Sequence, residues 1–241
     1  MKRLPLLLSV PHAGLEVPPE AAPYCVLTPA DIEADGDVGA ADIYALEDRV
    51  AAFLTTRVAR AIVDLNRADD DRRPDGVVKT LTSWEAPVYE PFPPEDVVET
   101  LLARYHRPYH EGLRVRARRP EVLLGIDCHT MAVEGPPIGP DPGVPRPAVC
   151  LSDGDGTCPH AWIEELANCF RKQFADRPEL EVTINRPFTG GYVIRSHARE
   201  LPWIQLELSR GPFLTYVGKQ AAVISALARF CVRLRSAGGW R

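Results

Sequence analysis

The chain has 241 residues, of which 45% are hydrophobic and 25% are charged, and its mean hydropathy is −0.14. This length suits one sizeable core, so we expect residues 1–241 to form a single domain. The net charge of −5, without a long basic stripe, argues against a nucleic-acid partner. No apolar run approaches the ~20 residues of a membrane span, and the six cysteines lack a C-x-x-C pair, so we expect a reduced, cytoplasmic protein that does not bind a membrane.

Three short apolar runs in the sequence each lead into a polar motif. They are residues 6–10 before Pro11-His12-Ala13-Gly14, residues 61–63 before Asp64-Leu65-Asn66-Arg67, and residues 122–126 before Asp127-Cys128-His129-Thr130. Each run reads as a strand, and ligands of an open α/β sheet bind outside the carboxyl ends of its strands. We therefore expect the three motifs to converge on one site. Their histidines, amide and guanidinium indicate a metal together with an anionic substrate.

Apolar side chains at helical intervals predict helices around these runs. The predicted helices are residues 31–53, 95–113, 160–174 and 218–234. The second is expected to be strained around Pro108. Residues 68–94 and 135–147 are polar or rich in proline and predict two long loops, which in compact domains often serve as functional lids.

Residues 203–208 alternate strictly between apolar and polar side chains, which is typical of a strand. The apolar side chains share one face, and Gln205 and Glu207 share the other. Glu207 is therefore either a general base whose pKa is raised by burial or a carboxylate on an exposed edge strand. The alternation of strands and helices along the chain predicts an α/β sandwich with a largely parallel sheet.

His12 and His129 are candidate metal ligands because each stands at the end of a predicted strand. Asp127 points the same way as His129 if the strand continues, and a carboxylate in that place orients a metal-binding imidazole. Zinc hydrolases use three protein ligands and keep one position for water. The candidates for the third ligand are Asp35, Asp37 and His110. The alternative is that both histidines are hydrogen-bonded core or loop residues.

Asn66 and Arg67 place an amide and a guanidinium directly after a predicted strand. Arg binds carboxylates through two parallel hydrogen bonds, and Asn can orient the pair. These two residues therefore predict a site for a substrate carboxylate. The alternative is a surface salt bridge between Arg67 and the acidic residues 69–71.

A set of motifs occurs in a fixed order along residues 11–210. They are Pro11-His12-Ala13-Gly14, Asp37-x6-Tyr44, Arg60-x3-Asp64-Leu65-Asn66-Arg67, Tyr105-x2-Pro108-Tyr109-His110, Asp127-Cys128-His129-Thr130, Asn185-x-Pro187-Phe188-Thr189-Gly190-Gly191 and Gln205-x-Glu207. As an ordered set they resemble the N-formylglutamate amidohydrolase family, which is similar to zinc carboxypeptidases and aspartoacylases. The resemblance implies a three-layer α/β/α sandwich around a mixed, largely parallel sheet, of the zinc-carboxypeptidase-like (phosphorylase/hydrolase-like) type.

The resemblance also implies roles for the site residues. One zinc ion per chain, or another divalent metal, would be bound by His12, Asp37 and His129. Glu207 would activate the water, and Arg60 would contact the carbonyl of the substrate. The substrate-binding residues would be Asn66, Arg67, His110, Gly190, Gly191 and Arg195. The two glycines would let the backbone approach the ligand, or they form a simple β-turn.

The implied activity is zinc-dependent hydrolysis of the amide of an N-acylated acidic amino acid, first of all N-formyl-L-glutamate to L-glutamate and formate, as in histidine degradation. One alternative is a hydrolase of the same class with another N-acyl amino acid or peptide as substrate. A second is a catalytically silent binding protein of the same fold. A third is a thiol hydrolase that uses Cys128 with His129 or His110. The sequence carries no signal for the oligomeric state.

The sequence departs from these relatives at two places. Zinc carboxypeptidases carry a His-x-x-Glu ligand pair, but here Leu15 stands at that position and Glu16 follows one residue too late. This departure favours Asp37 as the third ligand. Cys128 stands beside His129 where family members often show Ser, which leaves a thiol near the site. Adjacent residues of a strand point to opposite faces, so these two side chains form a poor nucleophile and base pair.

Overall fold

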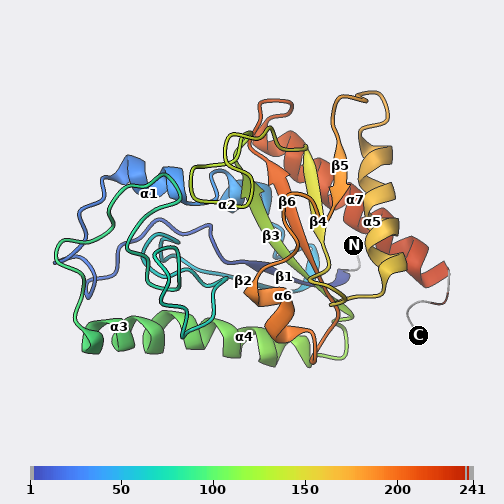
Figure 1. Ribbon diagram of the computed structural model, residues 1–241. Helices are drawn as coiled ribbons and strands as arrows, with labels where there is room; N and C mark the ends of the chain where they lie inside the picture. The colour runs from blue at the N-terminus through green and yellow to red at the C-terminus, as the bar shows by residue number, and fades with distance from the viewer. Residues whose placement is uncertain (1–2, 237, 239–241) are drawn as a thin grey trace.

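The computed structural model describes residues 3–236 and residue 238, and its centre is a six-stranded sheet (Figure 1). The strands are β1 (Leu4–Val10), β2 (Val50–Thr55), β3 (Leu124–Met131), β4 (Val149–Ser152), β5 (Val182–Ile184) and β6 (Trp203–Ser209), in the spatial order β2-β1-β3-β6-β4-β5. Strands β2, β1, β3 and β6 run parallel, whereas β4 is antiparallel to β6 and pairs in parallel with β5. The sheet is therefore mixed and largely parallel.

Helices cover both faces of this sheet (Figure 1). One face carries α3 (Glu95–Leu101), the π-helical turn η1 (Leu102–His106), α4 (Arg107–Ala117) and α6 (Tyr192–His197). The other face carries α2 (Ala40–Ile43), α5 (His160–Gln173) and α7 (Tyr216–Ser236), and α1 (Pro29–Asp35) precedes α2. The predicted three-layer α/β/α sandwich is confirmed. None of the described helices is long and apolar enough to cross a membrane.

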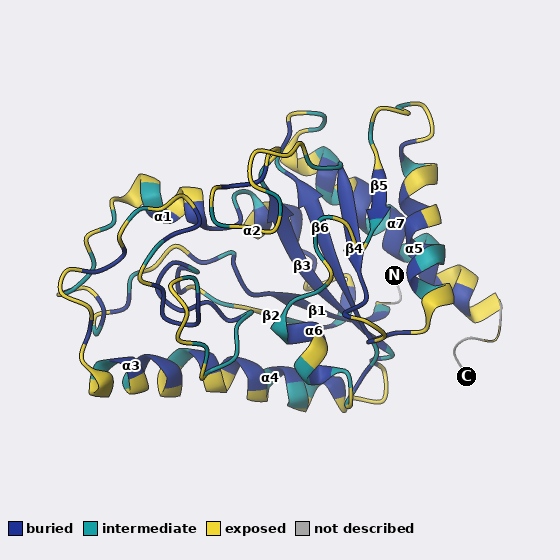
Figure 2. Ribbon diagram, viewed as in Figure 1, coloured by how far each residue is buried: buried dark blue, intermediate teal, exposed yellow. Residues whose placement is uncertain are grey.

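The two faces of the sheet have separate hydrophobic cores because successive side chains of a strand point to opposite faces. Leu6 and Leu8 of β1 pack in the core under α5 and α7. Leu7 and Trp203 pack in the core under α3 and α4. Figure 2 accordingly shows buried strands and helices whose exposed residues lie on their outward sides.

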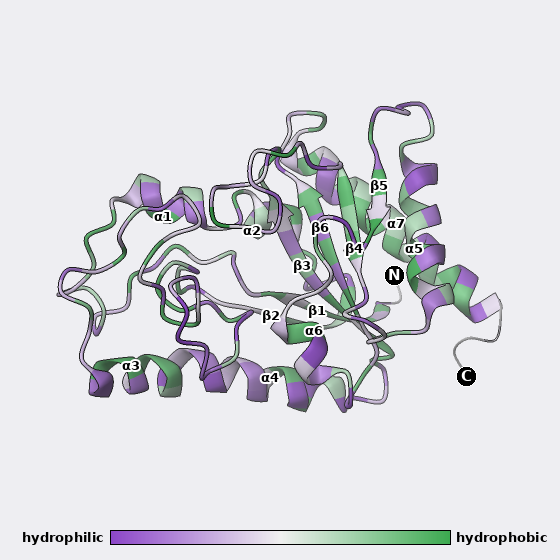
Figure 3. Ribbon diagram, in the orientation of Figure 1, coloured by the Kyte–Doolittle hydropathy of each residue, from purple (hydrophilic) through white to green (hydrophobic). Residues whose placement is uncertain are grey.

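The face that α4 and α6 cover changes character along the strands. At its amino end it is apolar, and Gly125 leaves room for the ring of Trp203, since a Cβ at Gly125 would lie 2.3 Å from that ring. Toward its carboxyl end the same face carries buried polar side chains, which are Ser9, Asp127, His129, Gln205 and Glu207. Figure 3 shows hydrophilic stretches within the otherwise largely hydrophobic strands of the sheet. A polar site is therefore built into the interior of the sheet face.

Two predicted elements are wrong. Residues 31–53 do not form one helix, because they contain most of α1, all of α2 and most of strand β2. Gly36 ends α1 in an extended conformation, and Gly39 precedes α2 with a φ of +79°, so the chain leaves the helical conformation between them. Residues 61–63, predicted as a strand, lie in a buried segment of turns outside the sheet.

Other predicted elements are confirmed with changed bounds. The helix over residues 95–113 continues to Ala117, and its strain appears as the π-helical turn before Pro108. Residues 160–174 and 218–234 match α5 and α7. Strand β3 runs on to Met131, so its polar motif lies within the strand. Strand β6 is confirmed but lies inside the sheet, buried on both faces, and β4, β5 and α6 were not predicted.

Candidate active site

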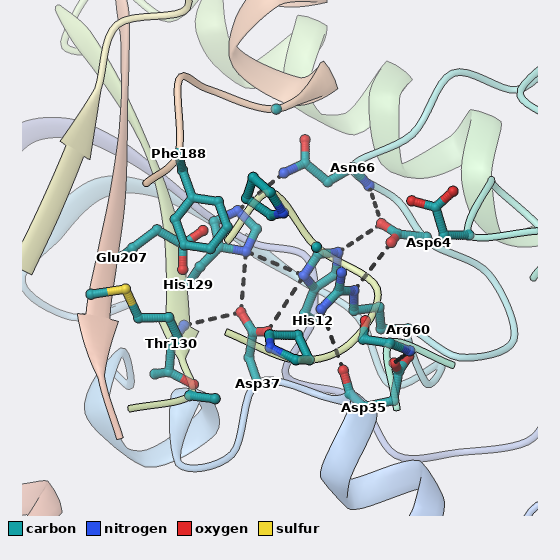
Figure 4. Close-up of a pocket in the computed structure, with 18 of the residues that line it drawn as sticks. His12, Asp35, Asp37, Arg60, Asp64, Asn66, His129, Thr130, Phe188 and Glu207 are labelled. Atoms are coloured by element: carbon teal, nitrogen blue, oxygen red, sulfur yellow. Dashed lines mark hydrogen bonds and ion pairs between the residues drawn. The ribbon is translucent and has the colours of Figure 1, made fainter. Parts of the chain in front are cut away.

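A cavity of about 500 Å³ lies at the polar end of this sheet face (Figure 4). Its walls come from the ends of the strands, from residues 60–67 and from the two long loops. The sequence-predicted site residues that line it are His12, Asp37, Arg60, Asn66, Arg67, His129, Gly190, Gly191 and Glu207. Two sequence-predicted site residues, His110 and Arg195, are not among the described residues that line it.

His12, Asp37 and His129 meet in this cavity and are all buried. The two Nδ1 atoms of the histidines lie 3.2 Å apart. Asp37 Oδ2 lies 3.1 Å from His129 Nδ1, and Asp37 Oδ1 lies 3.6 Å from His12 Nδ1. Two ligands that each bind a tetrahedral zinc ion at ~2.1 Å are about 3.4 Å from one another. The three donors therefore have the spacing of a zinc ligand set.

The outer nitrogen of each histidine faces a buried carboxylate. His12 Nε2 lies 2.8 Å from Asp64 Oδ1, and His129 Nε2 lies 2.7 Å from Asp127 Oδ2. A carboxylate only accepts, so each neutral ring carries its proton on Nε2 and turns the lone pair of Nδ1 toward the other ring. With both rings neutral, two lone pairs 3.2 Å apart would repel each other unless a proton or a metal ion lay between them. The residues present therefore fit a divalent metal.

The charged groups of this site shift one another's pKa values. Although burial works against it, Asp127 and Glu207 raise the pKa of His129 well above its ordinary value. Burial likewise opposes the shift at Asp37, but His12 and His129 hold the pKa of that carboxyl well below its ordinary value. Asp37 is thus ionised and available as a ligand.

Asp64 connects His12 to a buried network of charges. Its Oδ2 accepts a hydrogen bond from Arg60 Nε at 3.1 Å and lies 3.7 Å from Lys79 Nζ. Lys79 is wholly buried and pairs with Asp35 Oδ2 at 2.9 Å. Burial works to raise the pKa of Asp35, but Lys79 and Arg60 lower it to about 2. Asp35, one candidate for the third ligand, is thus engaged with Lys79.

No role was predicted for Asp64 or Lys79. Asp64 belongs to the motif Arg60-x3-Asp64-Leu65-Asn66-Arg67, so the sequence marked this residue, but no function was assigned to it. Lys79 is a single lysine in a predicted loop, and no pattern marks it.

Glu207 on β6 stands directly beside His129 on β3. Gln205 Nε2 donates a hydrogen bond to Glu207 Oε1 at 2.9 Å. Burial raises the pKa of Glu207 above its ordinary value, with His129 working against that shift. A carboxylate with a raised pKa at the edge of a metal-binding cavity is suited to accept and return a proton.

Arg67 is held by Asp75, and not by residues 69–71 as the alternative interpretation required. Its Nε donates to the carbonyl of Asp75 at 3.0 Å, and its Nη2 donates to the Asp75 carboxylate at 2.8 Å. The Asn66 side chain accepts from the backbone N–H of Val193 at 2.8 Å, and its Nδ2 lies 3.3 Å from His129 Nε2. Asn66 therefore links the segment of Arg67 to α6.

Gly191 approaches Asn66 so closely that a Cβ there would lie 2.2 Å from the amide nitrogen. Arg195 binds the surrounding loop, because its guanidinium donates to the carbonyl of Gly190 at 3.2 Å and to the carboxylate of Asp155 at 2.9 Å. His110 contacts the protein interior and not the cavity. The substrate-contact roles expected for Arg195 and His110 therefore do not match their positions.

The cavity lining also includes Arg146, Phe188 and Arg210, to which sequence reasoning assigned no role. Arg146 lies over the ring of Phe188 at 4.8 Å and donates two hydrogen bonds to Asp141. Arg210 lies 3.7 Å from Asp37 Oδ1. Phe188 belongs to the motif Asn185-x-Pro187-Phe188-Thr189-Gly190-Gly191, and Arg146 lies in the predicted loop 135–147. Arg210 follows Glu207 by three residues, and no sequence motif includes it.

Cys128 lies on the opposite face of β3 from His129, in the core under α5 and α7. It is wholly buried, and burial raises the pKa of its thiol well above the ordinary value. The thiol is therefore separated from the cavity, which argues against a thiol hydrolase. Glu16 forms an ion pair with Arg57 at the surface and is not part of the donor set.

Comparison with known proteins identifies the family. The model of the N-formylglutamate amidohydrolase family matches residues 4–213. An N-formylglutamate deformylase from Pseudomonas putida is 27% identical over 228 residues, which cover 88% of this chain and 82% of that protein.

Solved structures show the same fold. An N-formylglutamate amidohydrolase from Ralstonia eutropha JMP134 superposes with a TM-score of 0.76 at 20% identity, covering 98% of this chain and 96% of that one. A gene product from Agrobacterium tumefaciens superposes with a TM-score of 0.71 at 18% identity, covering 97% and 90%. From the family match and the relatives together, the chain belongs to the N-formylglutamate amidohydrolase family and is a hydrolase that acts on an amide bond.

Proposed function

We propose that the chain hydrolyses N-formyl-L-glutamate to L-glutamate and formate, with one zinc ion held by His12, Asp37 and His129. The observation that carries the proposal is the pair of Nδ1 atoms, 3.2 Å apart, beside the Asp37 carboxylate. Zinc bound there would supply a Lewis acid for the formyl carbonyl and would lower the pKa of a water from ~16 toward ~7. Helices pack on both faces of one sheet, which supports one catalytic domain.

Glu207 moves the proton in this proposal. One of its oxygens is occupied by the Gln205 amide, which fixes the plane of the carboxylate and leaves the other oxygen for the attacking water. In its ionised form Glu207 accepts the water proton. It then delivers that proton to the nitrogen of the departing L-glutamate, and the raised pKa favours this return.

The arginines of the cavity bind and polarise the substrate. Arg67 is held rigidly by Asp75 and binds a substrate carboxylate. Arg60 is fixed by Asp64, and its guanidinium stabilises the negative charge that develops on the formyl oxygen. Asp64 thus supports two parts of the site, because it fixes Arg60 and also orients His12.

The first test is metal content per chain, paired with hydrolysis of N-formyl-L-glutamate before and after chelation. The proposal expects about one zinc per chain, loss of activity on chelation and its return with zinc. N-acetyl-L-glutamate and N-formyl-L-glutamine serve as matched substrates that change only the acyl group or only the side-chain charge. Bound metal without turnover of any of them would support the silent binding protein. A preparation that binds no zinc even when supplied would refute the ligand assignment.

A further inference from the structure

Two buried histidines outside the cavity contact the backbone of the segment that carries Arg67. His106 Nε2 lies 2.8 Å from the carbonyl of Arg67, and His110 Nε2 lies 3.0 Å from the carbonyl of Leu65. Between them, the carbonyl of Asn66 accepts from the backbone N–H of Tyr192 at 3.4 Å. Three consecutive carbonyls of this segment are therefore each bound by a donor from another element.

These contacts matter because the segment has no helix or strand of its own. Its backbone groups cannot be satisfied by a regular ladder, so side chains must fix its path. His106 ends the π-helical turn, and His110 lies one turn later in α4. Residues four apart share one helix face, and the two rings lie 4.4 Å apart between centroids. The helix thus presents two imidazoles to one short segment.

The hydrogen-bond geometry fixes the tautomer of both rings. A carbonyl only accepts, so His106 and His110 must each carry a proton on Nε2. Burial lowers the pKa of His106 and lowers that of His110 to about 3, so each ring has one proton only. The Nδ1 atom of each ring is then unprotonated and carries a lone pair.

The two Nδ1 atoms differ in their surroundings. His110 Nδ1 lies 2.9 Å from His197 Nε2. Glu200 lies 3.1 Å from the other nitrogen of His197, and Arg114 Nε lies 3.7 Å from Glu200. His106 Nδ1 is buried without a partner among the described residues. Burying a ring nitrogen without a hydrogen-bond partner costs folding free energy. This cost indicates that His106 contributes through the hydrogen bond that its Nε2 makes.

We propose that His106 and His110 are positioning residues that hold Arg67 in place for the substrate carboxylate through the carbonyls of Arg67 and Leu65. The inference rests on the proposed function, because the binding of a substrate carboxylate by Arg67 is part of that proposal. It replaces the expectation that His110 itself contacts the substrate.

The kinetic test compares two kinds of variant at each histidine. His106→Phe and His110→Phe keep a ring and remove the donor, whereas His106→Gln and His110→Gln keep an amide N–H near the place of Nε2. The Phe variants are expected to raise KM for N-formyl-L-glutamate about five- to tenfold, the effect of one lost buried hydrogen bond, with kcat within about twofold. The Gln variants are expected within about twofold of wild type in both.

A double-mutant cycle shows whether the effect passes through Arg67. In an Arg67→Met background, His106→Phe is expected to cause no further rise in KM, because the side chain it positions is gone. A rise of the same size in both backgrounds would overturn the inference, as would a Phe variant that lowers kcat with KM unchanged. His160→Phe, at an exposed histidine on α5, is the control for adding a ring.

A measurement without turnover separates this inference from the proposed function. Nitrogen NMR of the histidine rings is expected to show His106 and His110 protonated on Nε2 and unprotonated on Nδ1, with slow exchange of both protons. This result together with an enzyme that does not hydrolyse N-formyl-L-glutamate would support the contacts and reject the substrate. A proton on Nδ1 of His110 would overturn the inference whatever the substrate. If a Phe variant does not fold, the Gln variants and these spectra decide the question.

Discussion

The carboxylate behind His129 offers the sharpest test of the metal site. Asp127 is wholly buried, and its two oxygens accept from His129 Nε2 at 2.7 Å and from Ser9 Oγ at 2.7 Å. Asp127→Asn keeps the shape but removes the charge and one acceptor. An amide N–H turned toward His129 would favour a proton on Nδ1, which is the nitrogen that faces His12 and Asp37. The change therefore weakens the ligand set without touching a ligand.

The expected size of this effect follows from the position of Asp127. Changes to residues that orient metal-binding histidines cost ~10- to 100-fold in metal affinity. This loss corresponds to about 1.4 to 2.8 kcal/mol of binding free energy. Because Asp127 also loses one of two short hydrogen bonds at a buried position, we expect the upper half of that range.

The assay is competition for zinc between the protein and a chromogenic chelator at fixed pH. Asp153→Asn is the matched control, because Asp153 is also buried and bonds to an amide, that of Asn185, at 3.0 Å outside the cavity lining. The dissociation constant is expected to rise in Asp127→Asn and to stay within about twofold in the control. Equal zinc affinity in wild type and Asp127→Asn would refute the reasoning that this carboxylate fixes the ligand tautomer.

Three further predictions concern the base, the buried lysine and the glycine turn. Glu207→Gln should lower kcat by ~10²- to 10⁴-fold with zinc affinity unchanged, and a small effect would exclude Glu207 as the base. In the wild type, kcat/KM should fall as pH drops through the pKa of Glu207, which burial raises above 4.5, because only the ionised carboxylate accepts a proton. Lys79→Met leaves Asp35 buried without its ion-pair partner and should cost ~3–5 kcal/mol of unfolding free energy in urea titrations; an unchanged midpoint would contradict the pairing. Gly191→Ala forces a Cβ to within 2.2 Å of the Asn66 amide and should cost ~1–3 kcal/mol and raise KM, whereas unchanged kinetics would show that the turn moves aside freely.

The strands were predictable where a buried run was long enough to leave few other interpretations. β1 and β6 follow directly from residues 6–10 and from the alternation of residues 203–208. Residues 61–63 are equally apolar, but a run of three buried residues fits a turn as well as a strand. Periodicity also misled over residues 31–53, because buried side chains from two short helices and a strand happened to recur at helical spacing.

The predictable part of the site is the part built from local geometry. Asp127 and His129 are two residues apart on one strand, so their side chains share a face and their contact could be expected. The partner of His12 is Asp64, which lies 52 residues away in a segment without regular structure. Local patterns carry no information on such a contact. The same reason explains why Lys79 and the bonds of His110 to the Arg67 segment were missed.

The charges around the cavity explain why an acidic chain should bind both a metal and an anionic substrate. Five buried carboxylates stand against three cationic side chains, which are Asp35, Asp37, Asp64, Asp127 and Glu207 against Arg60, Lys79 and Arg210. With both histidines neutral, this set is left with two negative charges, which a divalent cation balances. The same excess raises the pKa of His129, so a proton and a metal compete for one position. In the proposed function, a metal that neutralised the centre would let Arg67 attract a substrate carboxylate without opposition from the interior.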